Sequence, residues 1–218
     1  MSGAGTGEGA AVLIADDHPL FRQALALAVG KVAPSARILE AGTLAGAVSA
    51  AIDAEQLMLI LLDLKMPGAV GYSGIALLHA EHPQVPILVV SSADGAAAQD
   101  EVRSFGAVGF LRKDSPLDEI EEAIGAALSG QRPARKLSEQ TLTPEGDVRD
   151  KVAKLTPTEL KVLLAVIQGQ LNKQIAYGLG ISEATVKGHM TAIMRKLDVS
   201  NRTQAALVAR SLGLDISH

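Results

Sequence analysis

The sequence predicts an α/β protein: a five-stranded doubly wound parallel sheet, followed by a small all-α domain of four helices with a helix-turn-helix. Three observations predict this fold class. Apolar runs without polar alternation recur over residues 10–128 and alternate with helical segments, which is typical of a parallel sheet buried on both faces. Periodicity then disappears over 129–154, where Gly, Pro, Ser, Thr and charges dominate. The remaining residues, 155–218, contain only short helical patterns separated by tight turns.

These changes predict how the chain is divided. Residues 1–9 are rich in glycine and are expected to form a disordered tail. The α/β domain is expected over 10–128, an interdomain linker over 129–154 and the helical domain over 155–218. A length of 218 residues suits two small domains.

The α/β domain is expected to alternate strands and helices five times. The strands are predicted at 11–15, 36–40, 57–62, 86–90 and 108–111. The helices that follow them are predicted at 19–29, 43–52, 74–81, 97–105 and from 115 to about 128. In the last of these, Ser115 is predicted as the N-cap and Pro116 as the first helical residue.

The four helices of the second domain have recognisable ends. Thr156 begins the first with a capping-box pattern, and the second is expected over 172–179, ended by Gly180. Ser182 caps a third helix that runs to about 197, and a last helix is expected over 201–212. Helix, glycine-containing turn and helix is the helix-turn-helix pattern.

Composition limits the possible functions. The chain contains no cysteine, which excludes disulfides, thiolate zinc sites and cysteine nucleophiles. No signal peptide or long apolar span is apparent, so we expect a cytoplasmic protein that does not enter a membrane. Residues 1–150 carry 11 basic and 20 acidic side chains, whereas 151–218 carry 9 and 4. This asymmetry indicates that the helical domain alone meets a polyanion, although uneven surface decoration is the simpler alternative.

Polar side chains follow the predicted strands at their carboxyl ends. Asp16 and Asp17 follow the first strand, Asp63 the third, Ser91 the fourth and Lys113 the fifth. Parallel strands bring these positions to one edge of the sheet, where crowded carboxylates require a cation such as Mg²⁺. An ionised aspartate beside Mg²⁺ and a lysine can accept a phosphoryl group, which the hydroxyl and the ammonium would then bind. Singly, each residue has an ordinary alternative: helix or turn caps for the aspartates, a turn for Ser91 and solvent for Lys113.

The segments DDHPLFR, LLDLKMPG, LVVSS and GFLRKD resemble, in order and spacing, the flavodoxin-like receiver domain of bacterial two-component response regulators. The resemblance covers about 11–128. It implies that Asp63 is the phosphoacceptor, that Asp17 binds Mg²⁺ directly and that Asp16 binds it mostly through water. The further residues that it implies are the Lys65 backbone carbonyl as a ligand, Ser91 and Lys113 on the phosphoryl group, and Phe110 as the aromatic whose rotamer reports activation.

Some residues of this domain fit the family less directly. Phe110 can also be an ordinary core residue. The loop GAVGYS after Pro67 is a few residues longer than the commonest family form, which can alter kinase recognition or dephosphorylation. His18 and His79 fit metal ligation poorly and are expected to be surface residues, with His18 near the site by position only.

The segments LTPTELKVL, NKQIAYGLGISEATVKGHMTAIMRKL and NRTQAAL resemble the four-helix DNA-binding domain of NarL/LuxR-type regulators over about 155–212. The resemblance places Lys187, Gly188 and Thr191 at base-facing positions in the major groove. Phosphate contacts are expected from four further residues, Thr185, His189, Asn172 and Lys173. A solvated charged face is the alternative for the two lysines.

Helical spacing supports this orientation independently. Val186, Met190, Ile193 and Leu197 recur on one face, which is expected to point inward. Gly188 and Thr191 are small, so DNA shape is expected to contribute to recognition. In the last helix, Ala205, Val208, Ala209 and Leu212 form an apolar stripe that can be domain core or dimer contact.

The combined prediction is a response regulator, not an enzyme. A sensor histidine kinase is expected to phosphorylate Asp63 with Mg²⁺, and a phosphorylated homodimer to bind paired half-sites in double-stranded DNA. Before phosphorylation, the receiver is expected either to cover the recognition helix or to prevent pairing. A phosphohydrolase is disfavoured because Lys65 stands where a second general acid would follow Asp63. A flavodoxin-like nucleotide binder is disfavoured because DDHP replaces a glycine-rich loop.

Overall fold

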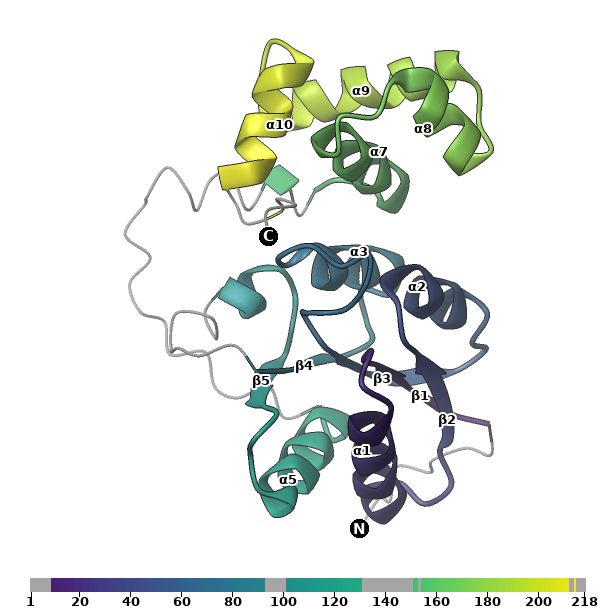
Figure 1. Cartoon of the computed structure of the whole chain (residues 1–218), viewed down its shortest axis with the longest axis vertical. Helices are drawn as coiled ribbons and strands as arrows, with labels where there is room; N and C mark the ends of the chain where they lie inside the picture. Colours follow the sequence, from purple (N-terminus) through teal and green to yellow (C-terminus); the bar gives the residue numbers. More distant parts are fainter. Residues whose placement is uncertain (1–8, 93–100, 131–150, 153, 212–213, 215–218) are drawn as a thin grey trace.

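The first domain is built on a five-stranded parallel sheet. The computed structural model describes residues 9–92, 101–130, 151–152, 154–211 and 214 (Figure 1). The strands are β1 Ala11–Ala15, β2 Arg37–Ala41, β3 Leu57–Leu62, β4 Ile87–Ser91 and β5 Gly109–Arg112. They lie in the order β2-β1-β3-β4-β5, and every neighbouring pair is parallel. The predicted doubly wound sheet is confirmed. β1 and β3 have the predicted bounds, and β2, β4 and β5 begin and end one residue later than predicted.

Helices cover both faces of this sheet (Figure 1). Because successive side chains of a strand point to opposite faces, alternate residues of β1 enter two cores. Val12 and Ile14 pack with α1 Pro19–Val32 and α5 Leu117–Leu128. On the other face, the core contains α2 Leu44–Ile52 and α3 Ser73–Glu81. Part of the helix expected at 97–105 lies outside the described residues. Within the described part of that range, residues 101–104 are helical.

The start of α5 differs from the prediction. The helix begins at Leu117, so Pro116 occupies the N-cap position instead of the first helical turn, and no side chain caps the helix. The Ser115 amide instead donates to the Arg112 carbonyl at 3.1 Å, and Pro116 has an extended ψ of 150°. The serine is therefore part of the turn after β5 and not a cap.

The second domain contains the helices α7 Pro157–Ile167, α8 Asn172–Leu179, α9 Glu183–Leu197 and α10 Arg202–Ser211. The capping box at α7 is present, with the Thr156 amide donating to Glu159 Oε2 at 2.7 Å and the Glu159 amide to Thr156 Oγ1 at 3.3 Å. Gly180, with φ of 66°, ends α8 in the left-handed conformation that glycine adopts readily. The Ser182 side chain then caps α9.

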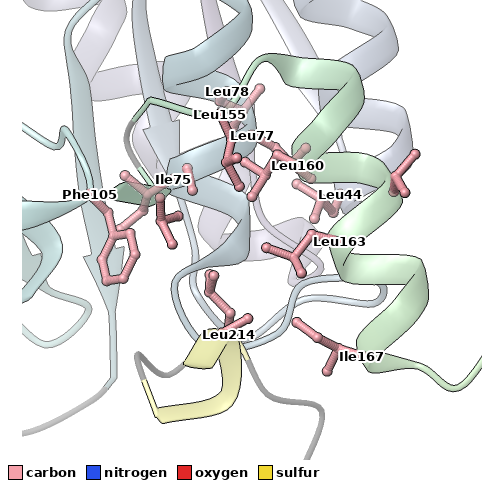
Figure 2. Packing of buried hydrophobic residues seen from close by; sticks show 14 of the residues in the cluster. Leu44, Ile75, Leu77, Leu78, Phe105, Leu155, Leu160, Leu163, Ile167 and Leu214 are labelled. Carbon is pink, nitrogen blue, oxygen red and sulfur yellow. The ribbon is translucent and has the colours of Figure 1, made fainter. Parts of the chain in front are cut away.

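The two domains share one continuous apolar cluster (Figure 2). Residues 73–78 of α3 are all buried, because one side of this helix packs on the sheet and the other on α7. Leu77 lies close to Leu155 and Leu160. At the edge of this contact, Lys161 Nζ and Glu81 Oε1 form an ion pair of 2.6 Å. We call this α3–α7 contact the domain interface.

The last residues of the predicted linker, 129–154, include packed positions. Residues 131–150 and 153 lie outside the described residues, but Lys151 and Val152 are helical. Val152 is 4% exposed and belongs to the shared cluster, so it is packed core. No helix in the described part of the chain has the length and apolar character needed to cross a lipid bilayer.

Candidate functional site

The carboxyl edge of the sheet brings together three of the predicted site residues. Asp16 follows β1, Asp63 follows β3 and Lys113 follows β5. Both aspartates are almost completely buried, at 1% and 2% exposure. Lys113 Nζ lies 2.6 Å from Asp16 Oδ2 and 2.8 Å from Asp63 Oδ2. One ammonium thus compensates two carboxylates that would otherwise repel each other.

The two oxygens of Asp63 have different partners. Oδ1 accepts the Lys65 amide at 3.0 Å, which is the turn cap considered as the ordinary alternative. Oδ2 accepts a hydrogen bond from Lys113 at 2.8 Å. The Asp63 amide is fixed by the Ala15 carbonyl at 2.8 Å. Capping therefore uses one oxygen and leaves the other in the polar cluster.

Lys113 is held as a cation. Burial lowers the pKa of its ammonium, but hydrogen bonds and charge interactions with Asp16 and Asp63 outweigh burial, so the pKa lies above its ordinary value. The Phe21 ring, whose centroid is 4.9 Å from Nζ, contributes a cation–π contact. Sequence reasoning did not include Phe21, because an aromatic one turn into α1 is also typical of core packing.

The same edge contains a possible metal site. One ligand atom each from Asp16, Asp17, His18 and Asp63 lie within 4.8 Å of one another. Three of these donors are carboxylates, the hard oxygen ligands that Mg²⁺ prefers. The donor set therefore fits a hard divalent cation.

His18 is closer to the site than predicted. Its Nδ1 lies 2.6 Å from Asp17 Oδ1 and 3.2 Å from Asp16 Oδ1, and its amide donates to Asp16 Oδ1 at 2.8 Å. Nδ1 is also 3.4 Å from Lys113 Nζ. The side chain is 66% exposed, so it is a surface residue as expected. The expectation that it is near by position only is wrong, because the turn after β1 directs its ring over the carboxylates.

Three further predicted residues lie on β4, on β5 and in the loop after β3. Ser91 is fully buried at the end of β4, and its carbonyl accepts the Lys113 amide at 3.0 Å. Phe110 of β5 is partly buried and packs against the core. Lys65 is exposed in the loop that follows Asp63.

In the helical domain, α9 presents one buried and one exposed face. Val186 and Ile193 are fully buried, and Met190 and Leu197 are nearly so, as the spacing predicted. Lys187, Gly188, Thr191 and Thr185 are exposed, as is Lys173 on α8, whereas His189 and Asn172 are partly exposed. The base-facing positions expected on α9 are therefore open to solvent in the full chain.

Several of these side chains are already oriented by neighbours. Thr191 Oγ1 donates to the Lys187 carbonyl at 3.1 Å, and the Thr185 hydroxyl lies 2.8 Å from Ser182 Oγ. Asn172 Oδ1 accepts from Arg202 Nη1 at 2.8 Å, which ties α8 to α10. In α10, Ala205 and Ala209 are buried core, Val208 is partly buried and Leu212 lies outside the described residues. Leu207, which was not part of the predicted stripe, is 58% exposed.

Comparison with known proteins identifies both domains. Residues 12–125 match the response regulator receiver domain family, and residues 153–209 match the family of bacterial regulatory proteins of the luxR type. The glycerol metabolism activator of Pseudomonas putida is 39% identical over 207 residues, covering 91% of this chain and 94% of that protein. The nitrate/nitrite response regulator protein NarP of Escherichia coli is 34% identical, covering 90% and 93%.

Solved structures agree with this assignment. The receiver domain of the putative response regulator NarL from Mycobacterium tuberculosis is 33% identical with a TM-score of 0.50, covering 57% of this chain and 99% of that one. RcsB of Salmonella typhimurium, at 21% identity and a TM-score of 0.52, shares the fold over 94% of this chain and 100% of its own. The chain therefore belongs to the response regulators that join a receiver domain to a LuxR-type DNA-binding domain.

Proposed function

We propose that this response regulator accepts a phosphoryl group on Asp63, from a sensor histidine kinase in the bacterial cytoplasm, and that this reaction controls its binding to DNA. The proposal assigns about 10–128 to the receiver and 155–218 to DNA binding. The observation that carries it is the bridge of Lys113 between Asp16 and Asp63 at the carboxyl edge of the sheet. That arrangement leaves a buried carboxylate beside an ammonium group, at the edge where open α/β sheets bind ligands.

Four groups would hold a Mg²⁺ ion at this edge: the carboxylates of Asp16, Asp17 and Asp63, and the backbone carbonyl of Lys65. The bound ion would supply positive charge to the oxygens of the incoming phosphoryl group. His18 contacts two of these carboxylates, so it would act beside the ion, on the ligands.

Asp63, Lys113 and Ser91 would take part in the phosphoryl transfer. An Asp63 oxygen forms a bond to phosphorus while the bond from phosphorus to the kinase's histidine nitrogen breaks, and that nitrogen keeps the electron pair. Lys113 is already 2.8 Å from Asp63 and would pair with a phosphoryl oxygen. The Ser91 hydroxyl would donate to another. These two contacts with the phosphoryl group would move the ends of β4 and β5, because Ser91 ends β4 and Lys113 follows β5.

The test is labelling of the full chain by a small phosphodonor such as acetyl phosphate, with Mg²⁺. Asp63→Asn is expected to abolish incorporation, because an amide cannot form the acyl phosphate. Asp53→Asn is the matched control, since Asp53 ends α2 and lies outside the carboxylate cluster. Undiminished labelling of Asp63→Asn would place the phosphoacceptor elsewhere.

We further propose that α9 enters the major groove, with Lys187, Gly188 and Thr191 toward the bases. Thr185, His189, Asn172 and Lys173 would meet phosphates. The exposure of α9 supports this orientation, as does the net positive charge of residues 151–218. The capping hydroxyls at the start of α9 lie at a helix N-terminus, which favours phosphate.

Phosphorylation would act on pairing of the protein and not on access to α9. The domain interface covers α7, while Lys187, Gly188 and Thr191 remain exposed. Of the two expected modes of inhibition, covering of the recognition helix is thus disfavoured. A phosphorylated homodimer would read two half-sites and gain affinity through effective concentration. Titration of DNA with the full chain, with and without phosphodonor, tests this; equal affinity in both states would contradict it.

A further inference from the structure

Tyr72 connects two segments of the receiver that are distant in sequence. Its ring stacks on Phe105, with centroids 5.4 Å apart and an interplanar angle of 20°. Its hydroxyl donates a hydrogen bond to Glu101 Oε2. Glu101 lies in the helical stretch 101–104 and Phe105 follows it directly. One side chain thus holds this stretch by its apolar ring and by a charge-assisted hydrogen bond.

Tyr72 is also firmly attached to α3. It occupies the N-cap position of this helix, and its carbonyl accepts the Ala76 amide at 3.2 Å. The next residue, Ser73, is 1% exposed and closes the preceding turn, since its Oγ accepts the Val70 amide at 2.9 Å and its amide donates to the Val70 carbonyl at 2.9 Å. Displacement of residues 101–105 would therefore also displace the N-terminal end of α3.

The 101–105 stretch reaches the DNA-binding domain as well. Phe105 is 7% exposed and lines a cavity of about 140 Å³ between the domains, together with Leu155 and Leu160. Figure 2 shows Phe105 beside Ile75 of α3, at the edge of the cluster away from α7. Phe105 thus lines the same cavity as Leu160 of α7, and the ring of Tyr72 stacks on it.

We propose that Tyr72 is a positioning residue that couples the phosphorylation site to the domain interface. The inference rests on the proposed function. Ser91, which would bind the phosphoryl group, ends β4 ten residues before Glu101. A movement of Ser91 toward the phosphoryl group would therefore act on the stretch that follows β4 in the chain, which Tyr72 holds. While the Tyr72 hydroxyl holds Glu101, Phe105 supports the docked DNA-binding domain. Movement of the stretch after phosphorylation breaks this hold and weakens the interface.

The experiment measures the distance between the domains directly. The chain has no cysteine, so single cysteines at Gln23 on α1 and Gln174 on α8, both exposed, can carry a pair of spin labels. Distance distributions of the full chain with Mg²⁺ are recorded with and without beryllofluoride, a phosphoryl mimic. Phosphodonor labelling of Asp63 is measured on the same proteins.

Tyr72→Phe keeps the ring and removes only the hydroxyl. We expect the fraction of separated domains without beryllofluoride to rise about threefold to tenfold, the range that corresponds to the loss of one ordinary intramolecular hydrogen bond. Labelling of Asp63 is expected to remain, because Tyr72 is outside the carboxylate cluster. Tyr177→Phe is the matched control, since Tyr177 is the other tyrosine, 92% exposed on α8.

A second variant separates coupling from packing. If the hydroxyl acts through Glu101, then Tyr72→Phe adds no further separation in a Glu101→Leu background. Additive effects of the two substitutions, or a Tyr72→Phe protein identical to the wild type in both states, would overturn the proposal alone. A wild type that is labelled on Asp63 but does not change its distance distribution would overturn the role of Tyr72 and leave the phosphorylation of Asp63 standing, whereas absent labelling would overturn the proposed function itself.

Discussion

The ion pair between Glu81 and Lys161 is expected to hold the domain interface closed before phosphorylation. The two side chains are 19% and 30% exposed, and their charged atoms are 2.6 Å apart. Exposed pairs contribute up to about 1 kcal/mol, while disruption of fully buried pairs costs about 3–5 kcal/mol. We therefore expect about 1–2 kcal/mol for this partly buried pair. Since about 1.4 kcal/mol is a factor of ten, Glu81→Lys would raise the separated fraction roughly fivefold to thirtyfold.

The charge swap provides the decisive comparison. Glu81→Lys and Lys161→Glu each place like charges together, whereas the double variant restores an attractive pair with the opposite polarity. The spin-label pair on α1 and α8 reports the separated fraction of each protein. The reversal Lys31→Glu is the control, because Lys31 pairs with Glu121 at 2.7 Å inside the receiver. If the swapped protein is no more closed than the single variants, the ion pair does not hold the interface.

The other expectations concern the metal site, the DNA-binding surface and the start of α7. Asp17→Asn should weaken Mg²⁺ binding by at least about tenfold and slow phosphodonor labelling, measured by metal titration, and an unchanged titration would exclude Asp17 as a ligand. Lys187→Ala should weaken the binding free energy by roughly 1–3 kcal/mol at one base position of the DNA site. Lys173→Ala should instead weaken binding to all sequences about equally and reduce the slope of log affinity against log salt by roughly one unit. Equal losses of affinity for specific and random DNA in Lys187→Ala would show that Lys187 contacts only phosphate. Burial raises the pKa of the Glu159 carboxyl, but hydrogen bonds from Lys196 and Thr156 outweigh it, so the pKa lies below its ordinary value of 4.5. Because the folded-state pKa is the lower one, this carboxylate stabilises the fold above about pH 4.5 and the stabilisation is lost as pH falls through the folded-state pKa. Glu159→Gln should lower the free energy of unfolding of residues 151–218 by about 2 kcal/mol at neutral pH. The variant should also lose less of this free energy than the wild type as the pH falls below 4.5. An equally steep decrease in both proteins would contradict the assignment.

Most of the receiver could be predicted because its signals are local and repeated. Each strand is an apolar run, and the side chains at Asp16, Asp63 and Lys113 follow directly from strand ends, so parallel topology alone brings them together. The helix starts at Thr156 and Ser182 were predicted correctly because their capping side chains act within one turn. At Ser115 the same kind of pattern was misleading, since the turn after β5 competes for the serine.

Contacts between distant segments could not be predicted in this way. The ring of His18 turns toward Asp16 and Asp17 because of the backbone after β1, which has no sequence signature. Tyr72 meets Glu101 and Phe105 only through the folded chain. A single signal for the domain interface was nevertheless present, because residues 74–78 of α3 contain no polar side chain.

The apolar stretch 74–78 of α3 also bears on the proposed regulation by pairing. Residues 73–78 of α3 are buried throughout, and on its outer side this burial depends on α7. Separation of the domains would expose Leu77 on the receiver, together with Leu155 and Leu160 on the DNA-binding domain, and exposed apolar patches favour new contacts. An opened receiver would thus be inclined to pair, while α9 is accessible in either arrangement. Regulation through pairing is therefore the mode that the burial of α3 and the exposure of α9 support together.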